Sequence, residues 1–176
     1  MIIKLLFYAL LLIWPSVLLS SSKIDKYNFS IQFSNLSIAK ISATVNKNEN
    51  KILYSIVSSS DGSLKSFYKF SSTIKGQSKR IRDKLFPSIY ETFSSYKGKT
   101  RKSYVEWDNS NDVIKFQNTP KLDLKKVNKI PQNTIFNVID PFTALINTID
   151  NLQLNNSCIN KFRVFDGRRR YDLEMI

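Results

Sequence analysis

The side chains that most often carry out chemistry in proteins are scarce in this sequence. The chain contains no histidine and one cysteine, Cys158. Histidine is the usual proton-transfer group near neutral pH, so neither a Ser-His-Asp nor a Cys-His catalytic site can form. A zinc site built from thiolates and imidazoles is excluded as well. We therefore expect no enzyme activity, no metal site and no cofactor.

A paired-carboxylate enzyme stays formally open, because that chemistry needs only Asp and Glu. The acidic residues, however, are scattered over predicted loops and strand ends, so we do not favour this reading.

The densest charged motif is Asp-Gly-Arg-Arg-Arg at 166–170. Asp-Gly predicts a tight hairpin, and the arginines on the returning strand then point alternately to opposite faces. At least one guanidinium should therefore enter the interior side of the sheet. We favour a structural ion pair for it over recognition of a phosphate or carboxylate. The candidate partners for the ion pair are Asp140, Asp166 and Asp172.

Alternating apolar residues predict the strands that position these groups. Residues 27–33 have the period of a strand with one buried face. In the next strand the apolar parity flips near Ala39-Lys40, which predicts a bulge or bend in a curved sheet. Residues 52–58 are apolar on both faces, which indicates coverage on each side.

The middle of the chain predicts further hairpins. Residues 62–69 favour a short helix leading into a strand. The basic cluster at 75–84, which contains Gly76, reads as a solvated hairpin or loop rather than a polyanion site. Residues 90–117 predict a three-stranded antiparallel meander, and the lysines at 121, 125, 126 and 129 lie on a connector.

The clearest helix signal is Asp140-Pro141, because aspartate can cap free amides and proline suits the first helical position. Apolar residues then recur at helical spacing over 141–152. The expected fold is mainly β, within the α+β class: a curved antiparallel sheet or open barrel with this one clear helix packed on it.

Residues 1–22 predict an export signal. Lys4 precedes a nearly unbroken apolar run at 5–19, which is too short to cross a bilayer comfortably, and small residues follow it. The alternative, an inner-membrane anchor formed by an uncleaved signal, is favoured by Trp14 and Pro15. We expect residues 23–176 to form a single domain in the periplasm, a usual length for one core.

The formal net charge of +13 would indicate nucleic acid in a cytosolic protein. An exported basic protein meets anionic membrane surfaces or acidic polymers instead, so we expect no nucleic-acid partner. The charge can equally reflect a lysine- and asparagine-rich proteome.

Two segments carry a resemblance to a known family. Asp140-Pro141-Phe142-Thr143-Ala144-Leu145, followed by Cys158 and by the run from Phe165 to Leu173, resembles the exported bacterial proteins catalogued as domain of unknown function 3108. The resemblance implies a periplasmic or envelope protein with a curved antiparallel sheet, similar in outline to open barrels that carry lipids or lipoproteins. It transfers no catalytic residues.

Family members tend to continue past the Phe-Asp-Gly-Arg-Arg hairpin, often with another cysteine. The resemblance therefore implies that the domain is incomplete after Ile176 and that Cys158 has a partner elsewhere. A buried free thiol is the alternative for Cys158.

We expect a non-enzymatic protein that holds an amphipathic ligand, such as a lipid or lipoprotein chain, in the concavity of the sheet. The alternative is an interaction module that binds an envelope protein or polyanion without a small ligand. The expected lining or core residues are Phe29, Ile31, Tyr54, Phe70, Tyr90, Phe93, Tyr104 and Trp107. The candidate ligand-binding residues are Arg168, Arg169, Tyr171, Tyr90 and Trp107. The candidate structural residues are Asp140, Pro141, Asp166, Gly167 and Cys158.

Overall fold

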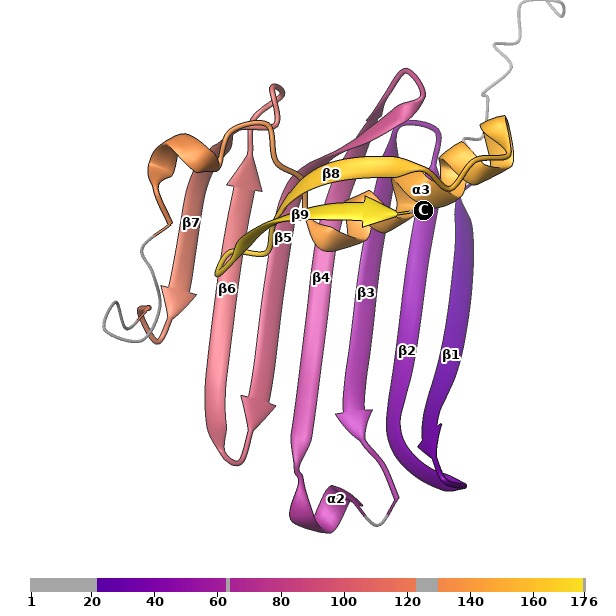
Figure 1. The fold of residues 1–176 in the computed structure, drawn as a ribbon, viewed down its shortest axis with the longest axis vertical. Helices are drawn as coiled ribbons and strands as arrows, with labels where there is room; N and C mark the ends of the chain where they lie inside the picture. Colours follow the sequence, from indigo (N-terminus) through magenta and orange to yellow (C-terminus); the bar gives the residue numbers. More distant parts are fainter. Residues whose placement is uncertain (1–21, 63, 123–129, 176) are drawn as a thin grey trace, which may run out of the picture.

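The computed structural model describes residues 22–62, 64–122 and 130–175. Its main element is one open, seven-stranded antiparallel sheet in which every strand pairs with its neighbours in the chain (Figure 1). The strands are β1 (Lys23–Phe33), β2 (Leu36–Asn48), β3 (Lys51–Ser60), β4 (Phe70–Ile81), β5 (Lys84–Tyr96), β6 (Lys99–Trp107) and β7 (Val113–Thr119). The expected mainly β fold is confirmed, and the sheet is not closed into a barrel.

Short turns connect neighbouring strands, as the sequence predicts, except that α2 lies between β3 and β4. The β5–β6 turn contains Lys97 and Gly98, both with positive φ, which is the turn geometry that suits two antiparallel strands. The β1–β2 register shifts at Ile31/Gln32, where Ile38 is the extra residue on β2. The predicted parity flip is therefore a β-bulge, displaced by one residue from Ala39.

Two further elements cover part of one face of the sheet. Helix α3 (Pro141–Asn155) and the hairpin of β8 (Asn160–Phe165) and β9 (Arg170–Met175) cross the upper half of the strands in Figure 1. We call the covered side the inner face. The short helix α2 (Leu64–Phe67) lies at the lower end, and a 3-10 turn, η1 (Gln132–Thr134), follows β7.

The core lies between α3, the hairpin and the upper half of the inner face. Its fully buried side chains come from both layers, with Val105 on β6 and Phe165 on β8 each 0% exposed. Phe116 on β7 packs edge-on against Phe165 at a centroid distance of 5.5 Å. The remaining members of this cluster are Val45, Ile52, Tyr54, Leu85, Tyr90, Trp107, Ile135, Val138 and Ile146.

One prediction about the strands is wrong. Strand β3 is covered on one face only, since Leu53 and Val57 on its other face are exposed.

The basic segment at 75–84, predicted as a hairpin or loop, is a hairpin. Strand β4 runs through Gly76 to Ile81, and a turn of two residues separates it from β5. Residues 75–80 contain no apolar side chain, so the period of apolar residues does not show that the strand extends this far.

Candidate functional site

The start of α3 is fixed to the sheet by a buried polar network around Asp140. The Asp140 Oδ1 atom accepts the backbone amides of Phe142 and Thr143, each at 2.9 Å, and the Tyr54 hydroxyl at 2.7 Å. The Thr143 hydroxyl bonds to Asp140 Oδ2 and lies 2.7 Å from the Ser78 hydroxyl. This N-cap therefore joins the helix to β3 and β4 as well as satisfying its own amides.

Burial sets the electrostatics of this network. Burial raises the pKa of Asp140, and the four hydrogen bonds from Thr143, Tyr54 and Phe142 oppose the rise. Burial and the neighbouring Asp140 carboxyl raise the pKa of Tyr54 well above its ordinary value. The network is buried, and its hydrogen bonds connect α3 to β3 and β4, which is a structural role.

Gly76 makes room for the Tyr54 ring. A Cβ atom on Gly76 would overlap the ring far inside van der Waals contact. The ring is held on its other side by Phe142, at a centroid distance of 4.2 Å. Glycine in the middle of β4 is thus explained by the close approach of a neighbouring side chain.

The loop between β8 and β9 is anchored on β6 and β7. Asp166 Oδ1 accepts the backbone amides of Arg168 and Arg169 at 2.8 and 2.7 Å, which forms the turn. Gly167 has a φ of +85°, and its carbonyl accepts the Asn118 side-chain amide at 2.8 Å. A Cβ on Gly167 would press on Val105. Both residues are needed for the hairpin to lie against the sheet.

Arg168 reaches from this turn across two strands. Its Nε donates to the Ser103 hydroxyl at 3.0 Å, and its Nη2 donates to the carbonyls of Lys102 and Thr119 at 3.2 and 3.3 Å. We expected the inward arginine to form an ion pair. Arg168 forms hydrogen bonds to a hydroxyl and two carbonyls instead, whereas Arg170 forms an ion pair with Asp172 at 2.9 Å.

A second guanidinium lies on the same face of β6 as the partner of Arg168, because Arg101 comes two residues before Ser103. Burial lowers the pKa of Arg168, the positive charge of Arg101 lowers it further, and Asp166 opposes the fall. Guanidinium groups are suited to binding an anion.

From the lower margin of the covered region downward, the strand register arranges the inner face into three successive rows, which we call the open inner face. In the first row Ala43 and Ser103 are still buried, and the hairpin turn lies over Ser103. The first row is Tyr27, Ala43, Ile56, Ile74, Thr92 and Ser103. The second row is Phe29, Ile41, Ser58, Ser72, Ser94 and Arg101. The third row is Ile31, Ala39, Ser60, Phe70, Tyr96 and Lys99.

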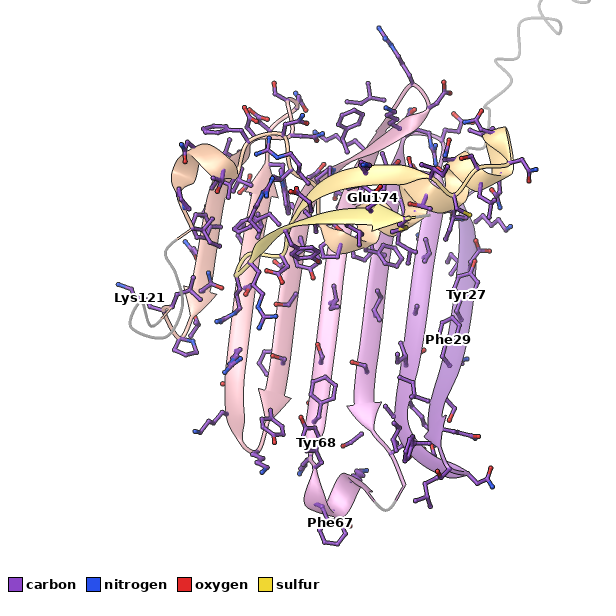
Figure 2. All side chains as sticks on the ribbon, viewed as in Figure 1. Tyr27, Phe29, Phe67, Tyr68, Lys121 and Glu174 are labelled. Atoms are coloured by element: carbon purple, nitrogen blue, oxygen red, sulfur yellow. The ribbon has the colours of Figure 1, made fainter. Side chains whose placement is uncertain are left out.

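The second and third rows change in chemistry from one edge of the sheet to the other. The second row begins with Phe29 and Ile41 and ends with Arg101 on β6, whereas the third row begins with Ile31, has Phe70 and Tyr96 on β4 and β5, and ends with Lys99; none of their residues is acidic. On β1 the exposed fractions are 45% for Tyr27, 55% for Phe29 and 43% for Ile31. Figure 2 shows Tyr27 and Phe29 on the part of the sheet that α3 and the hairpin leave uncovered.

Aromatic residues mark the lower margin of the open inner face. Tyr68, beside α2, packs against Tyr96 at a centroid distance of 4.6 Å, and both rings remain exposed (Figure 2). The open inner face is thus bounded by the α3–hairpin layer above and by this pair of rings below.

The candidate ligand-binding residues fall into different environments. Tyr90 and Trp107 are buried in the core, and burial raises the pKa of Tyr90, with Asp140, Asp166 and Tyr171 adding to the rise. Tyr171 is half-exposed on the hairpin, and Arg169 is exposed. Arg168 reaches Ser103 in the first row of the open inner face. The binding roles of Arg168 and Tyr171 stay predictions. Cys158 is a half-buried free thiol that follows α3.

The expected lining of the concavity is partly wrong. Phe93 and Tyr104 alternate with Thr92 and Ser103 and so lie on the opposite, outer face. Phe29, Ile31 and Phe70 do lie on the open inner face, whereas Tyr54 is buried in the core.

Sequence reasoning missed Arg101 and the serines of the second row. Arg101 lies in a run of basic residues, and the hairpin contact to Ser103 shows that it shares a face of β6 with the partner of Arg168. The strand alternation alone would have placed Arg101 and Lys102 on opposite faces.

Three comparisons with known proteins complete the description. The model of the family described as protein of unknown function (DUF3108) matches residues 26–176. No curated protein and no solved structure matches the chain. Among the residues that the structure describes, no helix is long and apolar enough to cross a membrane.

Proposed function

The chain belongs to the DUF3108 family, and we propose that it is a non-enzymatic protein of the cell envelope that binds an anionic amphipathic molecule on its open inner face. The single observation that carries this proposal is the second row, which runs from Phe29 and Ile41 through three serines to Arg101. An acyl chain would lie over the apolar end, and an acidic head group would lie between Arg101 and Arg168.

The apolar end supports binding of a chain. Tyr27, Phe29 and Ile31 each expose about half of a large side chain on the same face. Covering the exposed part of each would contribute about 1 kcal/mol. Neighbouring exposed apolar residues of this kind typically mark an interaction surface.

The dimensions fit a whole lipid-like molecule. Phe29 and Arg101 are separated by five strand spacings, about 24 Å at roughly 4.8 Å each. The hydrocarbon part of one bilayer leaflet is about 15 Å thick, half of a core of roughly 30 Å. The row can therefore accommodate an acyl chain together with its head group.

The predicted leader supports a location in the envelope. The apolar run at 5–19 and the small residues after it end just before Lys23, where β1 begins. In this proposal the leader directs export to the periplasm, or anchors the protein in the inner membrane if it is not cleaved.

The test compares a fluorescent fatty acid with its uncharged methyl ester, using protein expressed from the whole sequence. We expect Phe29→Ser to weaken binding of both probes about fivefold and Arg101→Gln to weaken binding of the acid alone. Phe93→Ser and Lys102→Gln are the matched controls, because both positions lie on the outer face. Neither should change the binding of either probe. Equal effects of the inner-face and outer-face variants would contradict the proposal.

A second candidate function rests on the exposed edge strand. Strand β1 is at the end of the sheet order, and ten of its eleven residues are exposed. Such an edge can pair with a strand of a partner protein. If the purified protein carries no lipid by native mass spectrometry but forms salt-sensitive complexes with envelope proteins, this interaction role replaces the carrier role.

A further inference from the structure

The outer face of the sheet, opposite the open inner face, is a second surface that α3 and the β8–β9 hairpin leave uncovered. Both of these elements lie on the inner side (Figure 1). Large apolar side chains on the outer face are exposed as a result, with Leu53 at 41%, Val57 at 48% and Phe93 at 40%. The charges around these side chains indicate what kind of partner the face fits.

The strand register places six lysines and two glutamates on this part of the outer face, a formal net charge of +4. We call this set of positions the outer patch. It consists of three rows, which run from Lys26 to Gln117, from Asn28 to Thr119 and from Ile24 to Lys115, and of the adjoining pair Lys51 and Lys79. Its charged residues are Lys26, Lys51, Lys75, Lys79, Lys102, Lys115, Glu91 and Glu106.

The lysines of the outer patch form no ion pair with another described residue. Two of them have a glutamate opposite in the register, since Glu91 faces Lys75 and Glu106 faces Lys115. Glu106 accepts the hydroxyl of Tyr104 at 2.9 Å. The other four lysines have no acidic residue opposite them on a neighbouring strand.

Two of these four lysines lie directly opposite each other. Lys51 on β3 pairs in the register with Lys79 on β4, and Lys79 donates a hydrogen bond to the Asn109 side chain at 3.3 Å. Like charges directly opposite each other destabilise a sheet. An anionic partner on the outer face would relieve this repulsion.

Aromatic rings support two more of the lysines. The Lys102 Nζ atom lies 5.5 Å from the centroid of the Phe93 ring, and the Lys115 Nζ atom lies 5.6 Å from that of Tyr104. Long lysine stems can lie along an apolar surface while their ammonium groups extend from it. Cations and exposed apolar side chains are therefore mixed on the outer patch. A bilayer surface offers phosphate groups to the former and the border of the acyl chains to the latter, whereas a soluble polyanion offers charge alone.

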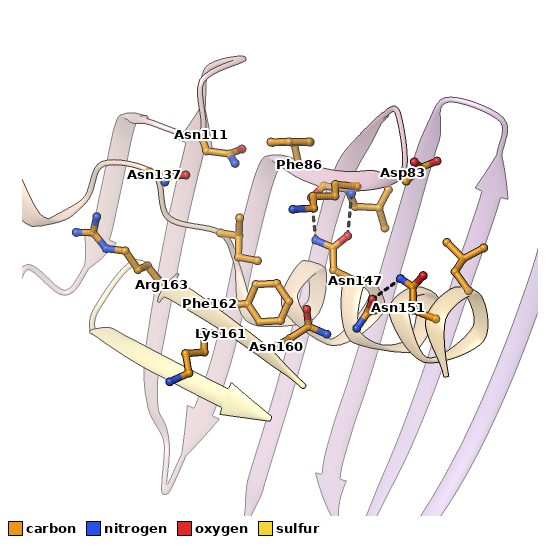
Figure 3. Close-up of a pocket in the computed structure, with 15 residues that line it drawn as sticks. Asp83, Phe86, Asn111, Asn137, Asn147, Asn151, Asn160, Lys161, Phe162 and Arg163 are labelled. Atoms are coloured by element: carbon orange, nitrogen blue, oxygen red, sulfur yellow. Dashed lines mark hydrogen bonds between the residues drawn. The ribbon is translucent and has the colours of Figure 1, made fainter. Parts of the chain in front are cut away.

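The outer face can lie flat on such a surface, whereas the inner side cannot, because the α3–hairpin layer stands on its upper half. Asn147 of α3 accepts the Leu85 amide at 2.8 Å and donates to the Leu85 carbonyl at 2.9 Å, which fixes the helix on β5 (Figure 3). The outer face spans six strand spacings, about 29 Å at roughly 4.8 Å each. Charges are screened beyond about 8 Å at physiological salt, so lysines spread over this width act together only when the face lies flat.

We infer that the outer patch docks the protein on an anionic bilayer surface. Its lysines face the phosphate groups, and Leu53 and Phe93 lie at the border between the head groups and the acyl chains. The open inner face then points away from the membrane. The inference does not depend on the proposed amphipath site, since the two surfaces lie on opposite faces and share no residue.

The experiment is acylation footprinting of the lysines in the full chain. The protein is mixed with vesicles of phosphatidylglycerol and phosphatidylcholine in equal parts, or of phosphatidylcholine alone. Any association through the apolar run at 5–19 is common to both vesicles, because their hydrocarbon interiors are alike. We expect Lys75 and Lys102 to react more slowly on the anionic vesicles, and this protection should disappear in about 1 M salt, where the screening length is about 3 Å. Lys161, on the α3–hairpin layer, is the internal control and should react equally on both.

Two double variants with the same loss of charge separate position from net charge. Lys75→Gln with Lys102→Gln should reduce the preference for anionic over neutral vesicles about twentyfold, because each lysine near an anionic surface contributes about fivefold. Lys161→Gln with Arg169→Gln removes two charges from the α3–hairpin layer and should leave most of the preference intact. All four positions are exposed, so neither variant should lower the urea midpoint.

Three results would overturn the inference. One is an equal effect of the two double variants, and another is protection of Lys161 in place of Lys75 and Lys102. The third is protection of the same lysines by soluble polyglutamate at a lower concentration of charge than by the vesicles, which would identify an acidic polymer as the partner. Binding of the fatty-acid probe is measured in parallel and should be unaffected by Lys75→Gln with Lys102→Gln, so that failure at one face is distinguished from failure at the other.

Discussion

The joint between α3 and the sheet gives a quantitative prediction for Asp140→Ala. The substitution removes the N-cap, which costs about 1 kcal/mol. It also leaves the buried Tyr54 hydroxyl without its acceptor, which costs about 1–3 kcal/mol. Removing a carboxyl that burial penalises offsets part of this loss. We therefore expect the free energy of unfolding to fall by at most about 2–4 kcal/mol in total.

A double-mutant cycle with Tyr54→Phe isolates the shared hydrogen bond. Once the hydroxyl is gone, Asp140→Ala no longer leaves it unsatisfied, so its cost should shrink by about 1–2 kcal/mol. Asp140→Asn is the matched control, because asparagine caps helices about as well as aspartate. Urea unfolding, followed by circular dichroism and by the fluorescence of buried Trp107, measures each variant. Additive costs within about 0.5 kcal/mol would refute the coupling.

Three further predictions concern the covered layer. Gly76→Ala should destabilise the fold by about 1–3 kcal/mol, because the new methyl group would overlap the Tyr54 ring. Gly98→Ala is the control: its Cβ would lie in open space, so only the positive φ should destabilise the fold, by about 1 kcal/mol. The urea midpoints of the two variants are compared. Arg168→Gln should cost about 1–2 kcal/mol through its lost hydrogen bonds, and exposed Arg169→Gln should stay within about 0.5 kcal/mol in the same assay. Because burial raises the pKa of Asp140, the folded state binds a proton at this carboxyl more tightly than the unfolded chain does. The contribution of Asp140 to the free energy of unfolding therefore falls as the pH rises from about 4, the pKa in the unfolded chain, through the pKa in the folded state. The stability difference between the wild type and Asp140→Asn should therefore change over this range, and a constant difference would contradict the shift.

The sequence contained enough local information to predict most of the elements. Asp140-Pro141 located the start of α3, since capping and the fixed φ of proline act within a few residues. The helix continues to Asn155, beyond the predicted 152, because polar residues in its last turn bond to one another and to the next segment.

Information that depends on the third dimension could not be read from the chain. The outward apolar residues Leu53 and Val57 resemble core residues until the register shows that nothing covers them within the described structure. Arg101 and Arg168 are far apart in sequence, and it is the packing of the hairpin on β6 that places Arg168 on Ser103, two residues from Arg101.

Photolabelling tests the central claim, a lipid-like molecule lying across the open inner face, most directly. A fatty acid with a diazirine at its methyl end should label peptides that contain Phe29 or Ile41, and one with the diazirine beside its carboxyl should label the peptide around Arg101. Labelling confined to outer-face residues such as Phe93, or the same labelling pattern from both probes, would contradict the account.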